Sequence, residues 1–159
     1  MADIEQIGKK AEAKIKEWLN RPEEGFWLYR LPDQMNGFYG SSNPCDFLLY
    51  RFPKMYCIES KAVSGDRFDF SMISNFQKKS MLEFSQVNGL TCYVAILFAT
   101  HQKLYLIDIR DIKHLEDEGT KSLNIKKKNS WKIAYIPVET IPSRKNMLDY
   151  DFEHAKHIF

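Results

Sequence analysis

The sequence predicts one domain of the α/β (α+β) class, in which helices flank a central mixed β-sheet. Its 159 residues suit a single domain, residues 1–159, that buries enough surface to fold without cross-links. Apolar residues follow helix or strand spacing in the order helix, three strands, helix, two strands, which is typical of a mixed sheet covered by helices. Hydrophobic and charged residues make up 44% and 28% of the chain, as in an ordinary globular protein.

The individual elements follow from local patterns. A helix is predicted over residues 3–19, where apolar residues recur at helical spacing between Lys and Glu. A second helix covers residues 72–87, and a short third one covers residues 111–118. Phe52-Pro53 indicates a tight reversal between two strands. The predicted strands are residues 26–31, 46–51, 54–60, 91–99 and 103–109, with residues 131–138 as a last strand or an extended segment.

The remaining segments are polar connections. Residues 32–44 and 62–70 are predicted loops, because Gly, Ser, Asn, Asp and Pro gather there. The polar stretch after about residue 142 is expected to be a flexible tail. The chain shows no apolar signal region and no apolar run of the roughly 18 residues that cross a membrane. A cytoplasmic protein without a membrane partner is therefore expected.

The three cysteines, Cys45, Cys57 and Cys92, do not suggest a cross-linked protein. Their number is odd and no two of them form a Cys-x-x-Cys pair, so neither a disulfide framework nor a zinc ribbon is indicated. Cys57 and Cys92 lie in apolar runs, where buried thiols are expected. This agrees with a reducing compartment.

Charge alone does not identify a nucleic-acid-binding protein. The net charge is only +2, from 23 basic and 21 acidic residues, so DNA binding has to depend on local clusters. Each cluster is equally compatible with a solvated face. The candidate DNA-binding residues are Lys9, Lys10, Lys78, Lys79, Lys126, Lys127 and Lys128.

The most informative stretch is the predicted hairpin around Phe52-Pro53. If Arg51 pairs with Lys54, the same antiparallel register places Asp46 directly opposite Glu59, with their Cβ atoms about 5 Å apart. Side chains alternate along a strand, so Lys61 shares the face of Glu59. Three charged residues then meet at one end of an apolar hairpin. A chance arrangement of charges at the end of a surface hairpin is the alternative.

Opposed carboxylates repel and need a compensating cation. Mg²⁺ suits them, because it binds oxygen ligands and usually takes one or two carboxylates together with water and substrate phosphate. Such an ion lowers the pKa of a bound water and offsets charge on a phosphate. Lys61 lies where an ammonium group could orient that water or stabilise developing charge. The pattern therefore predicts metal-dependent phosphodiester chemistry, with Mn²⁺ able to substitute.

Pro44-x-Asp46 followed by Glu59-x-Lys61 resembles the signature of the PD-(D/E)xK nuclease superfamily, and residues 46–109 are most similar to RecU-type Holliday junction resolvases. The resemblance implies a restriction-endonuclease-like core and catalytic roles for Asp46, Glu59 and Lys61. It also implies a helical Gln near the site, which Gln77 matches. Gly8-x-x-x-Glu12 is similar to an element of archaeal resolvases in which a helical Glu approaches the metal.

The expected function is therefore that of a Mg²⁺-dependent DNA endonuclease that nicks four-way junctions as a homodimer. A restriction- or repair-type nuclease on the same fold remains an alternative, as does a catalytically silent nucleic-acid-binding module. Two departures from the RecU pattern bear on the choice. Pro44 stands where RecU-type enzymes carry Thr, and residues 32–45 are too few for their long protruding segment.

Overall fold

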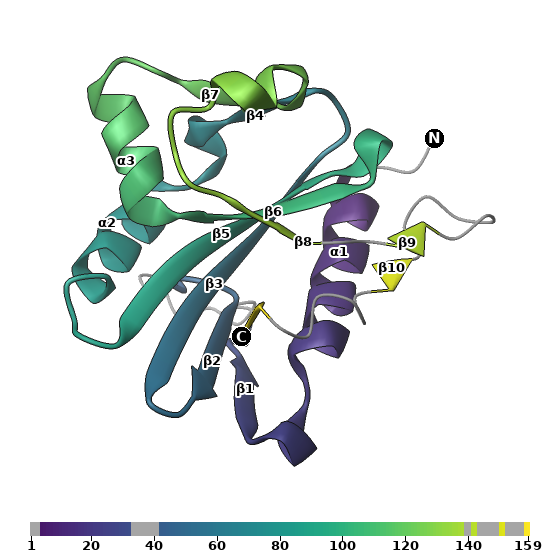
Figure 1. Cartoon of the computed structure of the whole chain (residues 1–159), viewed down its shortest axis with the longest axis vertical. Helices are drawn as coiled ribbons and strands as arrows, with labels where there is room; N and C mark the ends of the chain where they lie inside the picture. The colour runs from purple at the N-terminus through teal and green to yellow at the C-terminus, as the bar shows by residue number, and fades with distance from the viewer. Residues whose placement is uncertain (1–3, 33–41, 139–140, 143–149, 152–157) are drawn as a thin grey trace.

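The fold is built on a six-stranded sheet, as a computed structural model of the chain shows (Figure 1). The structure describes residues 4–32, 42–138, 141–142, 150–151 and 158–159. The strands follow the order β1-β2-β3-β5-β6-β8. Only β3 and β5 run parallel; the other neighbours are antiparallel, so the predicted mixed sheet is confirmed. The strands are β1 (Phe26–Arg30), β2 (Phe47–Arg51), β3 (Lys54–Val63), β5 (Leu90–Phe98), β6 (Lys103–Asp108) and β8 (Ile136–Val138).

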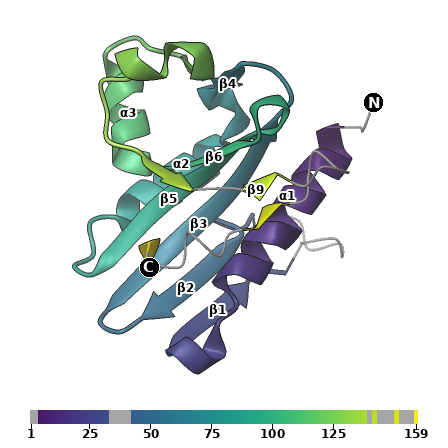
Figure 2. The ribbon, with the colours of Figure 1, turned by 45° about the vertical axis from the view of Figure 1, so that its right-hand side comes forward.

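Three α-helices cover the two faces of this sheet (Figures 1 and 2). The long helix α1 (Ile4–Leu19) lies across one face, whereas α2 (Asn75–Phe84) and α3 (Ile109–Asp117) cover the other. The parallel pair β3–β5 needs a crossover connection, and α2 provides it. All three helices were predicted, with ends that differ by a few residues.

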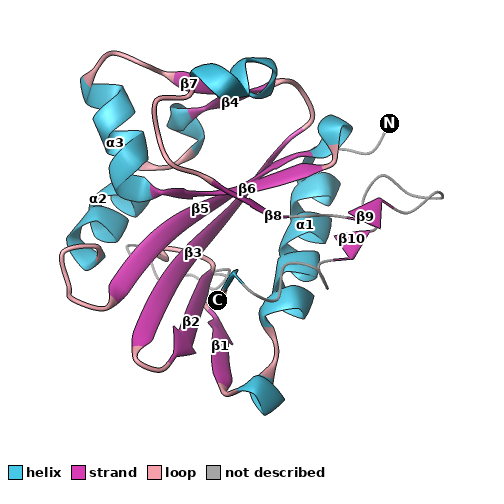
Figure 3. Ribbon diagram, viewed as in Figure 1, coloured by secondary structure: helices cyan, strands magenta, loops and turns pink. Residues whose placement is uncertain are grey.

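Shorter elements complete the chain (Figure 3). A two-stranded ribbon of β4 (Arg67–Asp69) and β7 (Ser122–Asn124) packs beside α3, and β9 (Ile141–Pro142) pairs with β10 (Tyr150–Asp151). The 3₁₀ turns are η1 (Pro22–Glu24), η2 (Phe70–Met72), η3 (Ala99–His101) and η4 (Ile125–Ser130). In the described part of the chain no helix is long and apolar enough to cross a membrane.

The alternation of side chains along β3 divides the core into two clusters. Ile58 and Ala62 face α1 and join its apolar residues, and the ring of Phe159 packs there against Trp18 and Tyr56. Cys57 and Val63 point to the opposite face and join the cluster beneath α2 and α3. Glu59 and Lys61 share this second direction, so they lie on the α2 side of the sheet.

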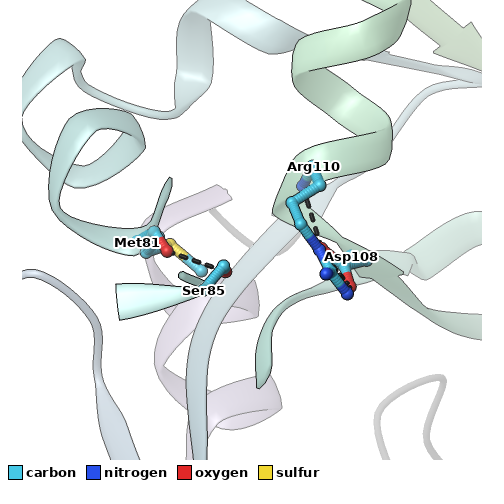
Figure 4. A network of polar contacts seen from close by, with 4 residues as sticks. All are labelled: Met81, Ser85, Asp108 and Arg110. Carbon is cyan, nitrogen blue, oxygen red and sulfur yellow. Dashed lines mark hydrogen bonds and ion pairs between the residues drawn. The ribbon is translucent and has the colours of Figure 1, made fainter. Parts of the chain in front are cut away.

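Side chains fix the helix ends on that side (Figure 4). At the end of α2, the hydroxyl of Ser85 donates to the carbonyl of Met81 at 2.8 Å. At the start of α3, the carboxylate of Asp108 accepts from the backbone N–H of Arg110 at 2.9 Å and pairs with its guanidinium. The Asp108 carboxylate satisfies a backbone N–H that the start of a helix leaves unpaired, whereas the Met81 carbonyl also accepts from the backbone N–H of Ser85 at 2.9 Å.

Two sequence-based predictions were wrong. Cys45 and Cys57 form a disulfide with their Cα atoms 6.3 Å apart, although no disulfide was expected; only Cys92 keeps a buried free thiol. The pairing arises because the chain bends at the start of β2 and turns Cys45 toward the same core cluster as Cys57. The predicted loop 62–70 is also wrong in part, because β3 continues to Val63 and Arg67–Asp69 form β4, which pairs with the distant β7.

Two predictions fall mostly on residues outside the described ranges: the loop over residues 32–44 and the flexible tail after residue 142.

The core position of Phe47 generates a stability prediction. Its side chain is fully buried in the α1-side cluster. Phe47→Ala should therefore lower the free energy of unfolding by about 3–5 kcal/mol, through reduced burial and a residual cavity. Phe76→Ala, on the exposed side of α2, is the matched control and should cost about 1 kcal/mol or less. Urea unfolding measures both, and equal decreases would contradict the assigned core.

Candidate active site

The β2–β3 hairpin has the predicted register, and it fixes Asp46 at its open end. Arg51 pairs with Lys54 and Phe47 with Ile58. The Asp46 carbonyl accepts from the N–H of Leu31 at 2.8 Å, and its own N–H donates to the carbonyl of Ile58 at 3.1 Å. Its carboxylate Oδ2 accepts from the N–H of Ser60 at 2.7 Å. Asp46 is therefore held by both neighbouring strands, next to Glu59 and Lys61, which flank Ser60 in β3.

Glu59 is the buried charged group at the centre of the site, with only 2% of its surface exposed. Its Oε1 lies 2.7 Å from the ammonium of Lys61 and accepts from the amide of Gln77, also at 2.7 Å. Its Oε2 is buried and has no hydrogen-bond partner among the described residues. An unpartnered buried carboxylate oxygen is costly, so it marks a position where a cation would be stabilising.

The pKa values of Asp46 and Glu59 are both raised, which indicates that the site lacks a positive charge to balance two carboxylates. Burial raises the pKa of Glu59 to about 7, and the carboxylate of Asp46 adds to the rise despite the opposing effect of Lys61. Burial also raises the pKa of Asp46 above its usual value, while the N–H of Ser60 acts in the opposite direction. Two carboxyl groups that resist ionisation together are typical of catalytic and metal-binding sites.

The donor set fits a hard divalent cation. Oδ1 of Asp46 and Oε2 of Glu59 remain without hydrogen bonds among the described residues. Within the same residues, no group of three or more His, Cys, Asp or Glu gathers as a metal site. Two carboxylates, with water and phosphate as further ligands, suit Mg²⁺ better than Zn²⁺, which requires three or four protein ligands.

Glu12 approaches the same cluster from α1. Its carboxylate forms an ion pair with Arg30, at the end of β1, and both groups act on the pKa of Asp46: Glu12 raises it and Arg30 lowers it. Glu12 was predicted from the sequence, whereas Arg30 was not. A single Arg at the end of an aromatic strand carries no distinguishing signal, since its proximity depends on how β1 pairs with β2.

Gln77 is brought to the site by the way α2 begins. Ser74 caps the helix: its hydroxyl accepts from the N–H of Gln77, and its own N–H donates to Oε1 of Gln77, both at 3.1 Å. This capping box orients the Gln77 amide so that its Nε2 faces Glu59. The sequence predicts that Gln77 lies near the site, and in the structure its amide contacts Glu59.

The candidate DNA-binding lysines have different surroundings. Lys9 pairs with Glu5 at 2.6 Å on the surface of α1, and Lys78 pairs with Glu116 between α2 and α3. Lys10 and Lys79 are exposed. The run 126–128 forms part of η4. Among the described residues, Lys61 is the only one of the basic residues that contacts Glu59.

An Asp at the start of one strand, with Glu-x-Lys on its antiparallel neighbour and a mixed sheet behind them, defines a nuclease of the PD-(D/E)xK class. The family described as Recombination protein U (RecU) matches residues 32–150, and the chain belongs to this family. RecU-type proteins are Holliday junction resolvases, which hydrolyse DNA phosphodiester bonds, so the resemblance stated from the motifs is confirmed.

Other comparisons add less. Among solved structures the chain is similar to Hjc of Archaeoglobus fulgidus, a Holliday junction resolvase from an archaeal hyperthermophile. The two are 19% identical with a TM-score of 0.48, and the match covers 65% of this chain and 78% of that one. Comparison with curated protein sequences found no match.

The raised pKa of Glu59 predicts how stability depends on pH. In the metal-free chain this pKa of about 7 exceeds the ordinary value of 4.5, so the protonated form stabilises the folded state. Relative to Glu59→Gln, the wild-type chain should lose stability as pH rises from about 4.5 through about 7. The decrease should be on the order of 3 kcal/mol.

Urea unfolding in EDTA, at about pH 5 and about pH 8, gives the free energy of unfolding of both proteins. The same pH dependence in wild type and Glu59→Gln would contradict a raised Glu59 pKa.

Proposed function

We propose that this chain is a Mg²⁺-dependent endonuclease that nicks four-way DNA junctions, with Asp46, Glu59 and Lys61 as its catalytic residues. The observation that carries the proposal is the buried, unpartnered Oε2 of Glu59 beside Asp46 and Lys61. A structural ion pair would have both carboxylate oxygens satisfied. A site that binds a metal leaves an oxygen for it.

Each residue has a distinct role in the proposal. Asp46 and Glu59 hold the cation, for which Mn²⁺ can replace Mg²⁺. When bound, the ion supplies Lewis acidity to the phosphate and lowers the pKa of a water nucleophile. Lys61 presents its ammonium to the attacked phosphate, and Gln77 keeps the Glu59 carboxylate in position. Glu12 acts from α1, held by Arg30.

The substrate follows from the family rather than from surface charge. RecU membership favours a branched DNA substrate over the linear duplex of a restriction- or repair-type nuclease. Burying the Glu59 carboxylate is unfavourable, and a catalytically silent binding module would have no use for it. Its presence therefore favours an enzyme.

Lys61→Ala should reduce cleavage by at least about 100-fold and leave junction binding within about threefold, because phosphate affinity is spread over many lysines. Labelled four-way junction, flap, single strand and linear duplex, each with Mg²⁺ or EDTA, provide the assay. Lys113→Ala, an exposed change on α3, is the control and should cleave like wild type.

Cleavage that persists in EDTA would remove the metal from the proposal. Near-normal cleavage by Lys61→Ala would remove Lys61 from the chemistry. Equal cutting of linear duplex and junction would leave a nuclease but not a resolvase.

We also propose a homodimer, because resolving a junction requires two opposed nicks and one chain carries one site. Among the aromatic residues that could form an interface, Phe26 is buried in its own chain and Trp131 is half-buried in an aromatic cluster. Trp27 and Tyr29 instead are about half exposed and stack on each other at 5.8 Å. They lie on β1, which forms the edge of the sheet. An exposed aromatic pair on an edge strand is a suitable surface for a second copy.

Replacing both Trp27 and Tyr29 by Ala should shift the dimer–monomer equilibrium toward monomer by at least about tenfold, since each buried aromatic contributes a few kcal/mol to an interface. Sedimentation at micromolar concentration, with and without junction DNA, reports the assembly. Phe76→Ala removes an equally exposed ring from α2 and is the control. A wild-type chain that stays monomeric on junction DNA would contradict the dimer.

A further inference from the structure

Three consecutive lysines in η4 have three different surroundings. The ammonium of Lys126 lies 2.6 Å from Asp66, which also contacts His101 at 2.6 Å. The ammonium of Lys128 lies over the rings of Tyr105 and Tyr135, at 5.7 and 5.9 Å from their centroids. Lys127 is exposed, lines a cavity and has no acidic partner among the described residues.

The cavity at Lys127 is one of two that adjoin. It has a volume of about 770 Å³ and lies between the β4–β7 ribbon, the end of α3 and the segment after η4. A second cavity of about 740 Å³ lies between the start of α2 and the end of α3. Thr120 lines both, so the two cavities meet at this residue, and we call the pair the Thr120 trough.

The balance of charge in the Thr120 trough is positive. Two of its carboxylates pair with a cation: Asp69 with Arg67 at 3.2 Å, and Glu116 with Lys78. The third, Glu118, lies 3.6 Å from His114, which carries a charge only when it is protonated. Three lysines are left over, with no acidic partner in the described part of the chain. They are Lys121, Lys127 and Lys132.

One end of the trough is next to the candidate active site. Ser74 and Asn75, at the start of α2, line the second cavity. Ser74 caps the helix through Gln77, whose amide donates to Glu59. A polyanion that follows the trough therefore arrives within one helical turn of the catalytic carboxylates.

We propose that the Thr120 trough binds the phosphodiester backbone of a DNA arm, with Lys121, Lys127 and Lys132 as its phosphate contacts. The inference rests on the proposed nuclease function. Lysines without acidic partners that are spread over two adjoining cavities match a row of phosphates, whereas a single small anion would occupy only one of them. The hydroxyl groups of Thr120 and Ser122 supply further hydrogen-bond donors along the wall.

The test is a triple variant, Lys121→Ala with Lys127→Ala and Lys132→Ala. Its control is Lys16→Ala with Lys54→Ala and Lys103→Ala, which removes the same charge from exposed lysines outside the trough. Fluorescence anisotropy in EDTA measures binding of labelled junction and linear duplex between about 50 and about 200 mM salt. Circular dichroism establishes that both variants are folded.

We expect the trough variant to bind at least about tenfold more weakly at about 0.1 M salt. In a plot of log binding constant against log salt concentration, the negative slope should become less steep by roughly 0.9 for each phosphate that a lysine no longer neutralises. The control should change both quantities much less. Lys126→Ala with Lys128→Ala should also have little effect, because those two ammonium groups are engaged within the chain.

The outcomes separate the two proposals. Binding and salt slope equal to those of the control variant would overturn the trough and leave the nuclease standing. A trough variant with reduced affinity, in a chain that binds DNA but never cuts it, would support the trough and remove the nuclease. A wild-type chain that does not bind DNA would overturn both.

Discussion

Two carboxylates on neighbouring strands, one of them withdrawn from water, are unfavourable unless positive charge accompanies them. In this chain Lys61 and Gln77 satisfy one oxygen of Glu59, and the other oxygen stays without a partner among the described residues. The elements around the site each help to position this arrangement. The β2–β3 register brings Asp46 to Glu59, α2 supplies Gln77, and α1 supplies Glu12. The hairpin, the crossover helix and the first helix thus meet at one buried group.

The parts of this arrangement that sequence predicts are those that depend on local chemistry. A Phe-Pro reversal fixes which residues of the hairpin face each other, and alternation fixes the side of the sheet for Glu59 and Lys61. The capping residue Ser74 and the spacing of Gln77 are likewise local. The class of fold, the three helices and the carboxylate pair were therefore predictable from the residues alone.

Features that depend on distant segments were not predictable. Arg30 reaches Glu12 because β1 pairs with β2 across a long connection. The Cys45–Cys57 pair depends on a bend at the start of β2, and β4 becomes a strand only because β7 lies beside it. The lysine run 126–128 shows the same limit. It looks uniform in sequence, but Asp66, Tyr105 and Tyr135 are needed to distinguish its members.

The amide of Gln77 performs two tasks with its two ends. Its oxygen accepts from the N–H of Ser74 and closes the start of α2, while its nitrogen donates to Glu59. Glu is the other residue common at this position of a capping box, and it would preserve the first bond. It would also replace the amide donor with a third carboxylate, next to Asp46 and Glu59, whose pKa values are already raised. Of these two residues, only Gln can make both bonds, and it does so through the N–H and hydroxyl of Ser74. The exposed Ser74 thus helps to orient the partner of a buried acid fifteen residues before it.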